Sequence, residues 1–197
     1  MIKLDLPHRR ATLDDAAAMA EFVNIAGEGL PFYLWTQSAE PGQSPWEVGW
    51  ERARREEGAF SYRNTILREE NGKPAACLIG YPLADEVQPP DYSAIPPMFV
   101  PMQQLEDQAP GTWYVNVLAS FPEHRGKGYG AELLALAEQL AVNEKKSALS
   151  IIVSDANTGA RRLYERVGFR ETARRPMIKD SWEHAGKDWV LLIKPVS

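Results

Sequence analysis

The chain has 197 residues, of which 44% are hydrophobic and 25% charged, a balance that is typical of a soluble globular protein. Its net charge of -5 at pH 7 argues against a general affinity for nucleic acid or an anionic membrane, although a local basic patch stays open. The single cysteine, Cys77, excludes an intrachain disulfide, no Cys/His cluster indicates a metal site, and no apolar run is long enough for a signal peptide or membrane span. We therefore expect one cytoplasmic domain over residues 1–197, with Cys77 as a buried structural thiol.

Residues 1–60 are predicted to hold a strand followed by helices. An edge strand is expected within residues 2–10, and Thr12 should cap the next helix, with Asp14 and Asp15 in its first turn. A pair of glycines ends this helix. Its apolar face is predicted to consist of Ala16, Met19, Ala20, Phe22, Val23 and Ile25.

Residues 30–50 combine aromatic side chains with proline and glycine, which predicts an irregular connection. Two interpretations stay open: the aromatics close over the core, or they form a wall of the substrate site, since loops on a rigid scaffold often determine specificity. A short helix over about 45–57 follows, and residues 1–60 are expected to form the substrate side. The aromatics concerned are Phe32, Tyr33, Trp35, Trp46 and Trp50.

Two strands, Ser61–Arg68 and Ala75–Pro82, are predicted around a turn that contains Asn71 and Gly72, a strong hairpin signal. A proline-rich connection over residues 82–111 then leads to the central strand. A connection of this length inside a compact domain is either functional or poorly ordered, and we interpret it as an insertion.

The centre of the chain, residues 113–131, reads WYVNVLASFPEHRGKGYGA: a buried strand, a turn, and a glycine-rich entry into a helix over about 128–144. Glycines let the backbone turn tightly and let a ligand approach, and the first amides of a helix lack intrahelical acceptors. With the helix dipole and the charges of Arg125 and Lys127, the turn favours a phosphate or pyrophosphate, although a plain tight turn stays open. The spacing matches neither a Walker A loop nor the GxGxxG dinucleotide fingerprint.

The rest of the chain alternates strands with one more helix. Asp155 or Asn157 is expected to begin this helix, and Gly168 to close it. The order of the elements predicts an α+β domain on a mixed sheet. The remaining strands are predicted over residues 148–154, 169–173 and 187–194.

Two motifs lie in order along the second half of the chain. Arg125, Gly128 and Gly130 form the pattern R/Q-x-x-G-x-G/A, and the downstream pattern N-x-x-A-x-x-L-Y-x-x-x-G-F is formed by Asn157, Ala160, Leu163, Tyr164, Gly168 and Phe169. Together they resemble the GNAT N-acetyltransferase family, closely over the acyl-CoA binding core at residues 112–175. The resemblance implies a mixed, mostly antiparallel central sheet flanked by helices, with a splayed central pair of parallel strands.

The resemblance also implies acetyl-CoA as the co-substrate, without a metal. The backbone amides of the turn would bind its pyrophosphate, and the main chain of Leu118–Ser120 would pair with its pantetheine arm. Asn157 would hydrogen-bond the pantetheine, although a purely structural role as a helix cap stays open. The implied cofactor-binding residues are Leu118, Ala119, Ser120, Arg125, Gly126, Lys127, Gly128, Tyr129, Gly130, Ala131, Asn157 and Ala160.

Tyr164 is the expected general acid, because a phenol with a pKa of about 10 can protonate a leaving thiolate whose pKa is about 8.5. The alternative is that Tyr164 only packs as an aromatic on its helix. Asn116 cannot ionise, so the central strand offers no base there, and an oxyanion-stabilising amide is expected near Leu118. A water chain stays open as the base, as do five side chains without a supporting motif: Asp85, Glu86, Glu106, Asp107 and His184.

The implied function is transfer of an acetyl group from acetyl-CoA to a primary amine of a small molecule or peptide, by direct attack. The alternatives are an acyl-CoA-binding sensor or regulatory domain, and a nucleotide binder, which would need a Ser or Thr after the loop. Aromatics at 32–50 and acids at 85–91 favour a cationic amine, whereas Arg174, Arg175 and Lys179 favour an anionic one. A homodimer and a longer acyl group stay open, and neither nucleic acid nor membrane is an expected partner.

Overall fold

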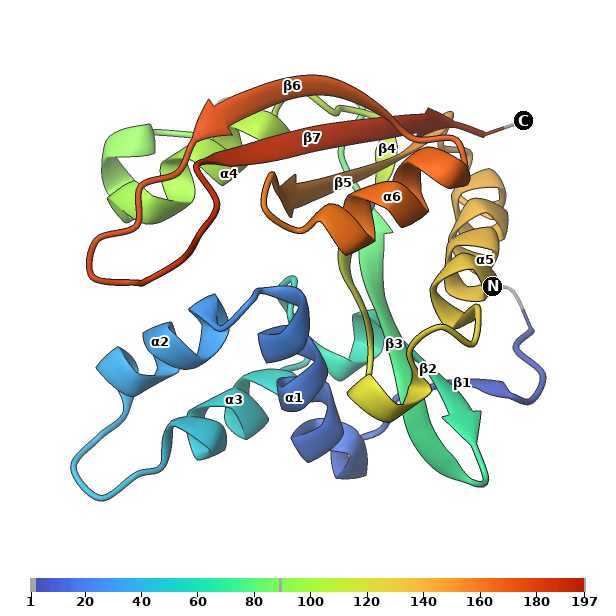
Figure 1. The fold of residues 1–197 in the computed structure, drawn as a ribbon, viewed down its shortest axis with the longest axis horizontal. Coiled ribbons are helices and arrows are strands. Elements are labelled where there is room, and N and C mark those ends of the chain that lie inside the picture. Colours follow the sequence, from blue (N-terminus) through green and yellow to red (C-terminus); the bar gives the residue numbers. More distant parts are fainter. Residues whose placement is uncertain (1–2, 89, 197) are drawn as a thin grey trace. The chain divides into compact units, whose positions relative to one another are not determined.

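The computed structural model describes residues 3–88 and 90–196, and the chain divides into two units. The first unit contains the chain up to Tyr81 together with Asn116–Leu134, and the second contains Pro82–Val115 and the chain from Ala135 onward. Within the described residues, the seven strands have the order β1-β2-β3-β4-β5-β7-β6, and β4 contributes to both units (Figure 1).

The first unit begins with a short strand and a capped helix. β1 (His8–Arg10) pairs antiparallel with β2 and is the first strand of the sheet, which confirms the predicted edge strand; residue 2 of the predicted range lies outside the described residues. A 3₁₀ turn, η1 (Leu13–Asp15), leads into α1 (Ala16–Ala26). The Asp15 carboxylate accepts a hydrogen bond from the Thr12 backbone N–H at 2.7 Å, which fixes the start of the helix.

Most of residues 30–44 are helical, so the predicted irregular connection is wrong. α2 (Leu30–Ser38) follows Gly29, whose φ of 90° lies in the left-handed region, and Pro31 occupies its first turn, where no backbone N–H is needed. The aromatic residues of this helix have modest helix propensity, which obscures it in the sequence. Burial of Trp35, which is only 2% exposed, outweighs that local preference.

α3 (Pro45–Ala53) confirms the predicted short helix, although it ends before residue 57. The Ser44 hydroxyl caps it by accepting a hydrogen bond from the Trp46 N–H at 3.3 Å. The Trp35 ring lies 5.9 Å from the ring of Trp46 and 6.2 Å from that of Phe60, centroid to centroid. For Trp35, the structure therefore favours the core interpretation over the substrate wall.

The predicted hairpin is confirmed. A 3₁₀ turn, η2 (Tyr62–Asn64), precedes β2 (Thr65–Glu70), which pairs antiparallel with β3 (Lys73–Pro82). Between the strands, Asn71 and Gly72 have φ values of 52° and 73°, the pair of left-handed residues that a tight hairpin turn requires.

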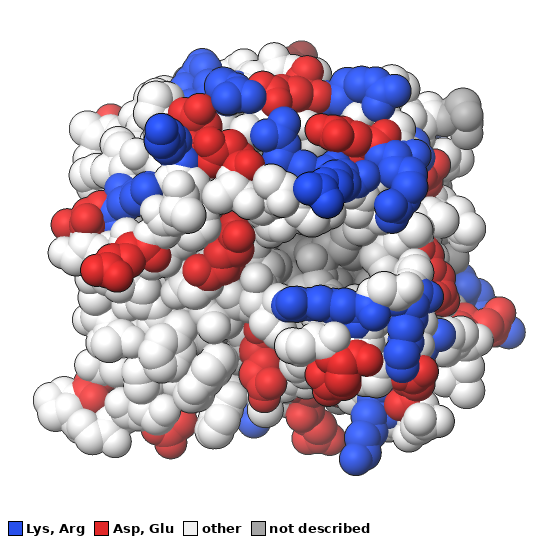
Figure 2. Space-filling model, viewed as in Figure 1, with Lys and Arg blue, Asp and Glu red and all other residues white. Residues whose placement is uncertain are grey.

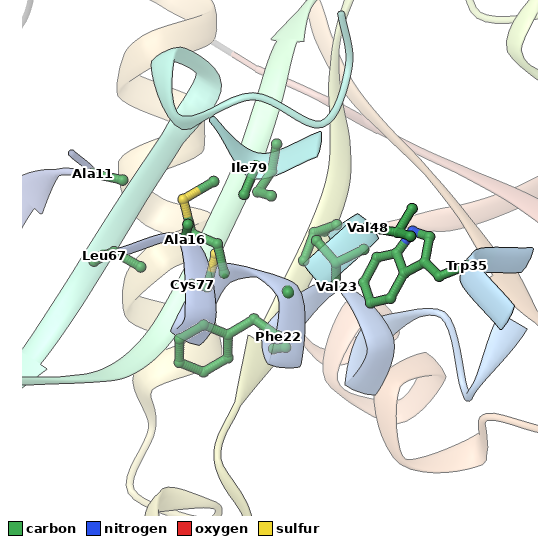
Figure 3. Packing of buried hydrophobic residues seen from close by; sticks show 14 residues of the cluster. Ala11, Ala16, Phe22, Val23, Trp35, Val48, Leu67, Cys77 and Ile79 are labelled. Carbon is green, nitrogen blue, oxygen red and sulfur yellow. The ribbon is translucent and has the colours of Figure 1, made fainter. Parts of the chain in front are cut away.

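The core of the first unit lies between α1, the α2–α3 pair and strands β2, β3 and β4 (Figure 3). The side chains of Phe22, Leu67 and Cys77 are fully buried there. Burial raises the pKa of the Cys77 thiol far above its usual range, so the thiolate that a nucleophile needs is disfavoured. These observations agree with the predicted structural role of this cysteine.

Substituting Gly49 by alanine is expected to lower the free energy of unfolding by about 1–2 kcal/mol, because a Cβ there would meet the Trp35 ring at 2.8 Å. Gly159→Ala is the matched control: it is also in a helix, and an added Cβ meets no described heavy atom within 4 Å. That change should be neutral or stabilising by up to about 1 kcal/mol. Urea denaturation measures both variants, and a Gly49→Ala protein as stable as the parent would contradict the packing shown here.

The second unit opens with the proline-rich residues 82–111. Apart from residue 89, which lies outside the described residues, this segment contains two 3₁₀ turns, η3 (Tyr92–Ala94) and η4 (Pro97–Phe99), and the helix α4 (Val100–Glu106). The Tyr92 hydroxyl donates to Asp107 at 2.6 Å and so joins η3 to the end of α4. The prediction of a long connection holds, and its described part has a defined structure.

Its two ends are held together by main-chain hydrogen bonds. The Leu83 N–H donates to the Thr112 carbonyl and the Gly111 N–H to the Ala84 carbonyl, both at 2.8 Å. The Lys146 ammonium reinforces this closure by donating to the Leu83 carbonyl at 2.8 Å. The two ends of residues 82–111 therefore lie next to each other in the second unit, and the interpretation of this segment as an insertion stays a prediction.

The sheet of the second unit has β7 between β5 and β6. The parallel pairing of β4 (Thr112–Ser120) with β5 (Ala148–Ser154) covers Thr112–Val115 and Ala148–Ile151. The pairs β5–β7 and β7–β6 are antiparallel. This mixed sheet confirms the predicted fold class, and the remaining elements are α5 (Tyr129–Asn143), α6 (Thr158–Arg166), β6 (Arg170–Pro176) and β7 (Asp188–Pro195).

Candidate acyl-CoA site

The glycine-rich turn lies open at the surface of the first unit. It follows β4 and the 3₁₀ turn η5 (Pro122–His124), and it leads into α5. Gly126 and Gly128 are exposed and have φ values of 77° and 87°, and an added Cβ at either would meet no described heavy atom within 4 Å beyond the glycine and its two chain neighbours. A ligand can therefore approach this backbone closely, as phosphate recognition by main-chain amides requires.

A carboxylate that the sequence did not reveal lies beside this turn. Glu70, the last residue of β2, accepts hydrogen bonds from the Lys127 ammonium at 2.8 Å and from the Tyr129 hydroxyl at 2.9 Å. The Nδ1 atom of His124 lies 2.5 Å from the same carboxylate. Lys127 is 57 residues from Glu70 along the chain, and no local motif links them.

This cluster changes the electrostatics expected of the turn. The hydrogen bonds from Lys127 and Tyr129 lower the pKa of Glu70 from 4.5 to about 2, so the carboxylate stays ionised at neutral pH. Since the charge of Lys127 is already paired and the Arg125 N–H donates to the Pro122 carbonyl at 3.2 Å, the exposed Arg125 side chain and the amides after residue 125 are left as the main attraction for a phosphate. The contacts should weaken only as the pH falls towards 2, where Glu70 becomes protonated.

The expected pantetheine strand shows a clear two-residue alternation. Val117 and Ala119 belong to the buried core cluster of the first unit, whereas Leu118 and Ser120 are half-buried. Since successive side chains of a strand point to opposite faces, Leu118 and Ser120 lie on the face away from that core. The main-chain pairing expected for Leu118–Ser120 stays a prediction.

In the second unit, Asn157 caps α6. Its side-chain oxygen accepts a hydrogen bond from the Ala160 backbone N–H at 3.2 Å, which confirms the capping interpretation. With this oxygen engaged, the NH₂ group is the part of the side chain that suits a bond to a cofactor. The cofactor roles of Asn157 and Ala160 stay predictions.

Tyr164 lies on α6 and is only 4% exposed. Its ring centroid is 5.8 Å from that of Phe169, the last residue of the motif that contains both. The ring of Tyr164 is therefore packed, and its role as the general acid stays a prediction, because burial of the ring and use of the hydroxyl are compatible.

The acidic candidates for the general base differ in their environments. Asp85 pairs with Lys146 at 2.6 Å, and Asp107 accepts hydrogen bonds from Tyr92 and Gln103. Burial, and to a smaller extent the charge of Asp107, raises the pKa of Glu106. Asp85 and Asp107 are thus engaged in structural contacts, and none of these residues is assigned as the base.

His184 is held within an aromatic stack. Its ring lies 4.4 Å from that of Trp182, nearly parallel, and Trp182 in turn stacks on Trp189 at 6.2 Å. The His184 Nδ1 accepts a hydrogen bond from the Gly186 N–H at 3.0 Å, so the neutral ring carries its proton on Nε2. The Nδ1 lone pair is therefore occupied by this hydrogen bond.

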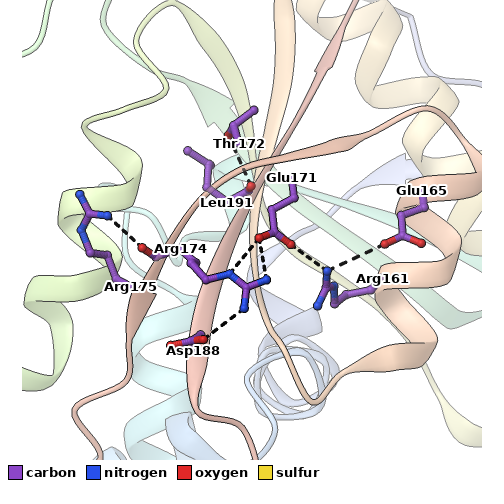
Figure 4. Close-up of polar contacts among 8 residues, drawn as sticks. All are labelled: Arg161, Glu165, Glu171, Thr172, Arg174, Arg175, Asp188 and Leu191. Atoms are coloured by element: carbon purple, nitrogen blue, oxygen red, sulfur yellow. Dashed lines mark hydrogen bonds and ion pairs between the residues drawn. The ribbon is translucent and has the colours of Figure 1, made fainter.

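One of the three basic residues that favoured an anionic substrate, Arg174, is already engaged in ion pairs. The Arg174 guanidinium bonds Glu171 at 2.6 Å and Asp188 at 3.2 Å, and Arg161 on α6 bonds Glu171 at 2.9 Å (Figure 4). Basic and acidic side chains also interleave along the upper part of Figure 2, over β6 and β7. Arg174 is therefore a weaker candidate for binding an anionic substrate than its charge suggests.

A hollow of about 310 Å³ lies in the first unit at the end of α2 and along α3. Its lining is mainly polar and includes none of the aromatic residues that were candidates for a substrate wall. The Nε atom of Arg52 is buried there without a hydrogen-bond partner among the described residues. The lining residues are Ser38, Glu40, Gln43, Val48, Glu51, Arg52 and Arg55.

No group of three or more His, Cys, Asp or Glu side chains is arranged to hold a metal ion within residues 3–88 and 90–196. Within the same residues, no helix has both the length and the apolar character that crossing a membrane requires.

The chain combines a mixed sheet that has one parallel strand pair with an open glycine turn between β4 and α5, which is the arrangement expected of the acetyltransferase fold. The model of the acetyltransferase (GNAT) family matches residues 30–169, and the chain belongs to this family. Membership supports acetyl-CoA-dependent acyl transfer as the general activity. No curated protein matches the sequence.

Solved structures share the fold at low sequence identity. A crystal structure of an acetyltransferase is 21% identical, with a TM-score of 0.66, and the match covers 96% of this chain and 99% of that one. An N-acetyltransferase from Staphylococcus aureus Mu50 is 18% identical, with a TM-score of 0.61 and coverage of 94% and 98%. A GNAT family acetyltransferase from Elizabethkingia anophelis with acetyl-CoA bound is 23% identical, with a TM-score of 0.50 and coverage of 67% and 75%.

Proposed function

We propose that this protein is an N-acetyltransferase that transfers the acetyl group of acetyl-CoA to a primary amine of a small molecule or peptide. The observation that carries the proposal is the open turn at Gly126 and Gly128, placed directly before the first turn of α5 in a chain of the acetyltransferase family. Exposed glycines in left-handed conformations also occur in turns that only connect elements, as at Gly58, so membership of the family is the second support for a coenzyme at this turn.

The binding roles follow from the chemistry of the residues. Main-chain amides of residues 126–131 bind the pyrophosphate, helped by the positive end of the α5 dipole and by the exposed Arg125 side chain, whereas the Arg125 N–H donates to the Pro122 carbonyl at 3.2 Å. The main chain of Leu118–Ser120 pairs with the pantetheine arm, and the NH₂ group of Asn157 donates to it. Acetyl-CoA supplies the activated acyl group as a thioester.

The reaction needs three further contributions from the chain. A free amine attacks the thioester carbonyl, and a main-chain amide near Leu118 stabilises the oxyanion. The Tyr164 hydroxyl then gives its proton to the departing thiolate. Because Asn116 cannot take a proton, the amine loses its own to water or to a side chain other than the one at this position of β4.

The proposal is tested by measuring thiol release from acetyl-CoA with a panel of amines that includes cationic and anionic members. We expect amine-dependent thiol release for at least one class, and mass spectrometry of the product should show an added acetyl group. Calorimetry with acetyl-CoA runs in parallel. Binding without release across a broad panel would favour the sensor alternative, and absence of binding would reject the acyl-CoA assignment.

A further inference from the structure

The Glu70 carboxylate contacts residues at both ends and in the middle of the glycine turn. Glu70 contacts His124 before the turn, Lys127 within it and Tyr129 at the start of α5, at 2.5, 2.8 and 2.9 Å. All three contacts come from the end of the β2 strand and lie within the first unit.

Lys127 and Tyr129, which contact Glu70, alternate with the glycines of the turn. Gly126 is followed directly by Lys127, and Gly128 by Tyr129. An added Cβ at either glycine would contact no described heavy atom within 4 Å, so packing against the glycines does not restrain the turn. Side-chain contacts at residues 127 and 129 therefore replace that packing.

Tyr129 connects this cluster of contacts to other residues of the first unit. It is buried, and the Arg68 guanidinium lies 3.5 Å from its ring centroid. Arg68 also pairs with Glu132 in the first turn of α5, at 3.5 Å. The carboxylate is thus one member of a network, whereas an isolated surface ion pair contributes little.

We infer that Glu70 is a positioning residue for coenzyme binding, which fixes the turn in the conformation that presents its amides to a phosphate. The inference rests on the proposed function for its ligand. A purely electrostatic argument predicts instead that Glu70 weakens coenzyme binding, since a carboxylate beside a phosphate site repels the ligand and neutralises the charge of Lys127. Water and salt screen that repulsion at an exposed site, whereas an unrestrained glycine turn loses conformational freedom whenever it binds.

The test compares Glu70→Ala and Glu70→Gln with the parent protein. Calorimetry should show acetyl-CoA bound about tenfold more weakly by Glu70→Ala, with a smaller loss for Glu70→Gln, whose amide oxygen still accepts one hydrogen bond. At saturating acetyl-CoA, kcat should stay within about twofold of the parent, so that the effect falls on KM for the coenzyme. Glu123→Ala, which removes an exposed acid from the adjoining η5, is the control and should bind normally.

Hydrogen exchange of the ligand-free proteins separates this inference from the proposed function. The amides of residues 125–130 should exchange faster in Glu70→Ala than in the parent, while those of the core strands stay unchanged. If the parent bound no acetyl-CoA, the proposed function would fail, and exchange would still decide whether Glu70 positions the turn. Unchanged exchange, or acetyl-CoA bound as tightly as or more tightly than by the parent, would overturn the positioning role.

Discussion

Replacing Gly128 by valine is expected to weaken acetyl-CoA binding by at least about 30-fold, which corresponds to about 2 kcal/mol. Gly128 has a φ of 87°, and an L residue in the left-handed region costs roughly 1–2 kcal/mol, with more for a β-branched side chain. Valine relieves this strain by moving the backbone, which turns the amides away from the phosphate. Its added methyl groups also occupy the space through which the ligand approaches.

Gly58→Val is the matched control for this substitution. Gly58 has a φ of 93° and, like Gly128, an added Cβ there meets no described heavy atom within 4 Å. The strain is comparable, but Gly58 lies between α3 and η2, so acetyl-CoA binding should be unchanged. Calorimetry measures the affinities, and circular dichroism verifies that both variants are folded. Equal affinity for the parent and Gly128→Val would remove the turn from the coenzyme site. Gly130→Val, in the first turn of α5, provides a second test of the same site.

Replacing Tyr164 by phenylalanine should lower kcat by roughly 100-fold or more, the usual range for loss of a general acid. The ring that packs against Phe169 is kept, so the fold and the acetyl-CoA affinity should change little. The loss should therefore fall on kcat rather than on KM for the coenzyme. Steady-state kinetics with an amine from the thiol-release panel provides the measurement.

Tyr92→Phe is the control for loss of a tyrosine hydroxyl. Tyr92 also lies in the second unit, and its hydroxyl donates a hydrogen bond to Asp107 at 2.6 Å. We expect a destabilisation of about 1 kcal/mol with a normal rate. If Tyr164→Phe retained the parent rate, the acid role would be rejected, and Tyr164 would be a packing residue of α6.

Several features of the fold could be predicted because they depend on neighbouring residues. Asn71 and Gly72 specify their turn, since only residues that accept a positive φ fit it. Asn157 specifies the start of α6 through a hydrogen bond that spans three residues. The linked motifs around Gly128 and Tyr164 indicate the family from the sequence, because their spacing reflects a strand-turn-helix arrangement that is local in the chain.

The sequence by itself thus determined the fold class, most of the helices and strands, the glycine turn and the family resemblance. Only the tertiary structure decided that residues 30–38 are helical, since burial of Trp35 outweighs weak local propensity. It alone brought Glu70 to the turn, where it pairs with Lys127 at a separation of 57 residues. The physical reason is the same in both cases: local patterns set backbone conformation over a few residues, whereas burial and charge pairing depend on neighbours that only the folded chain supplies.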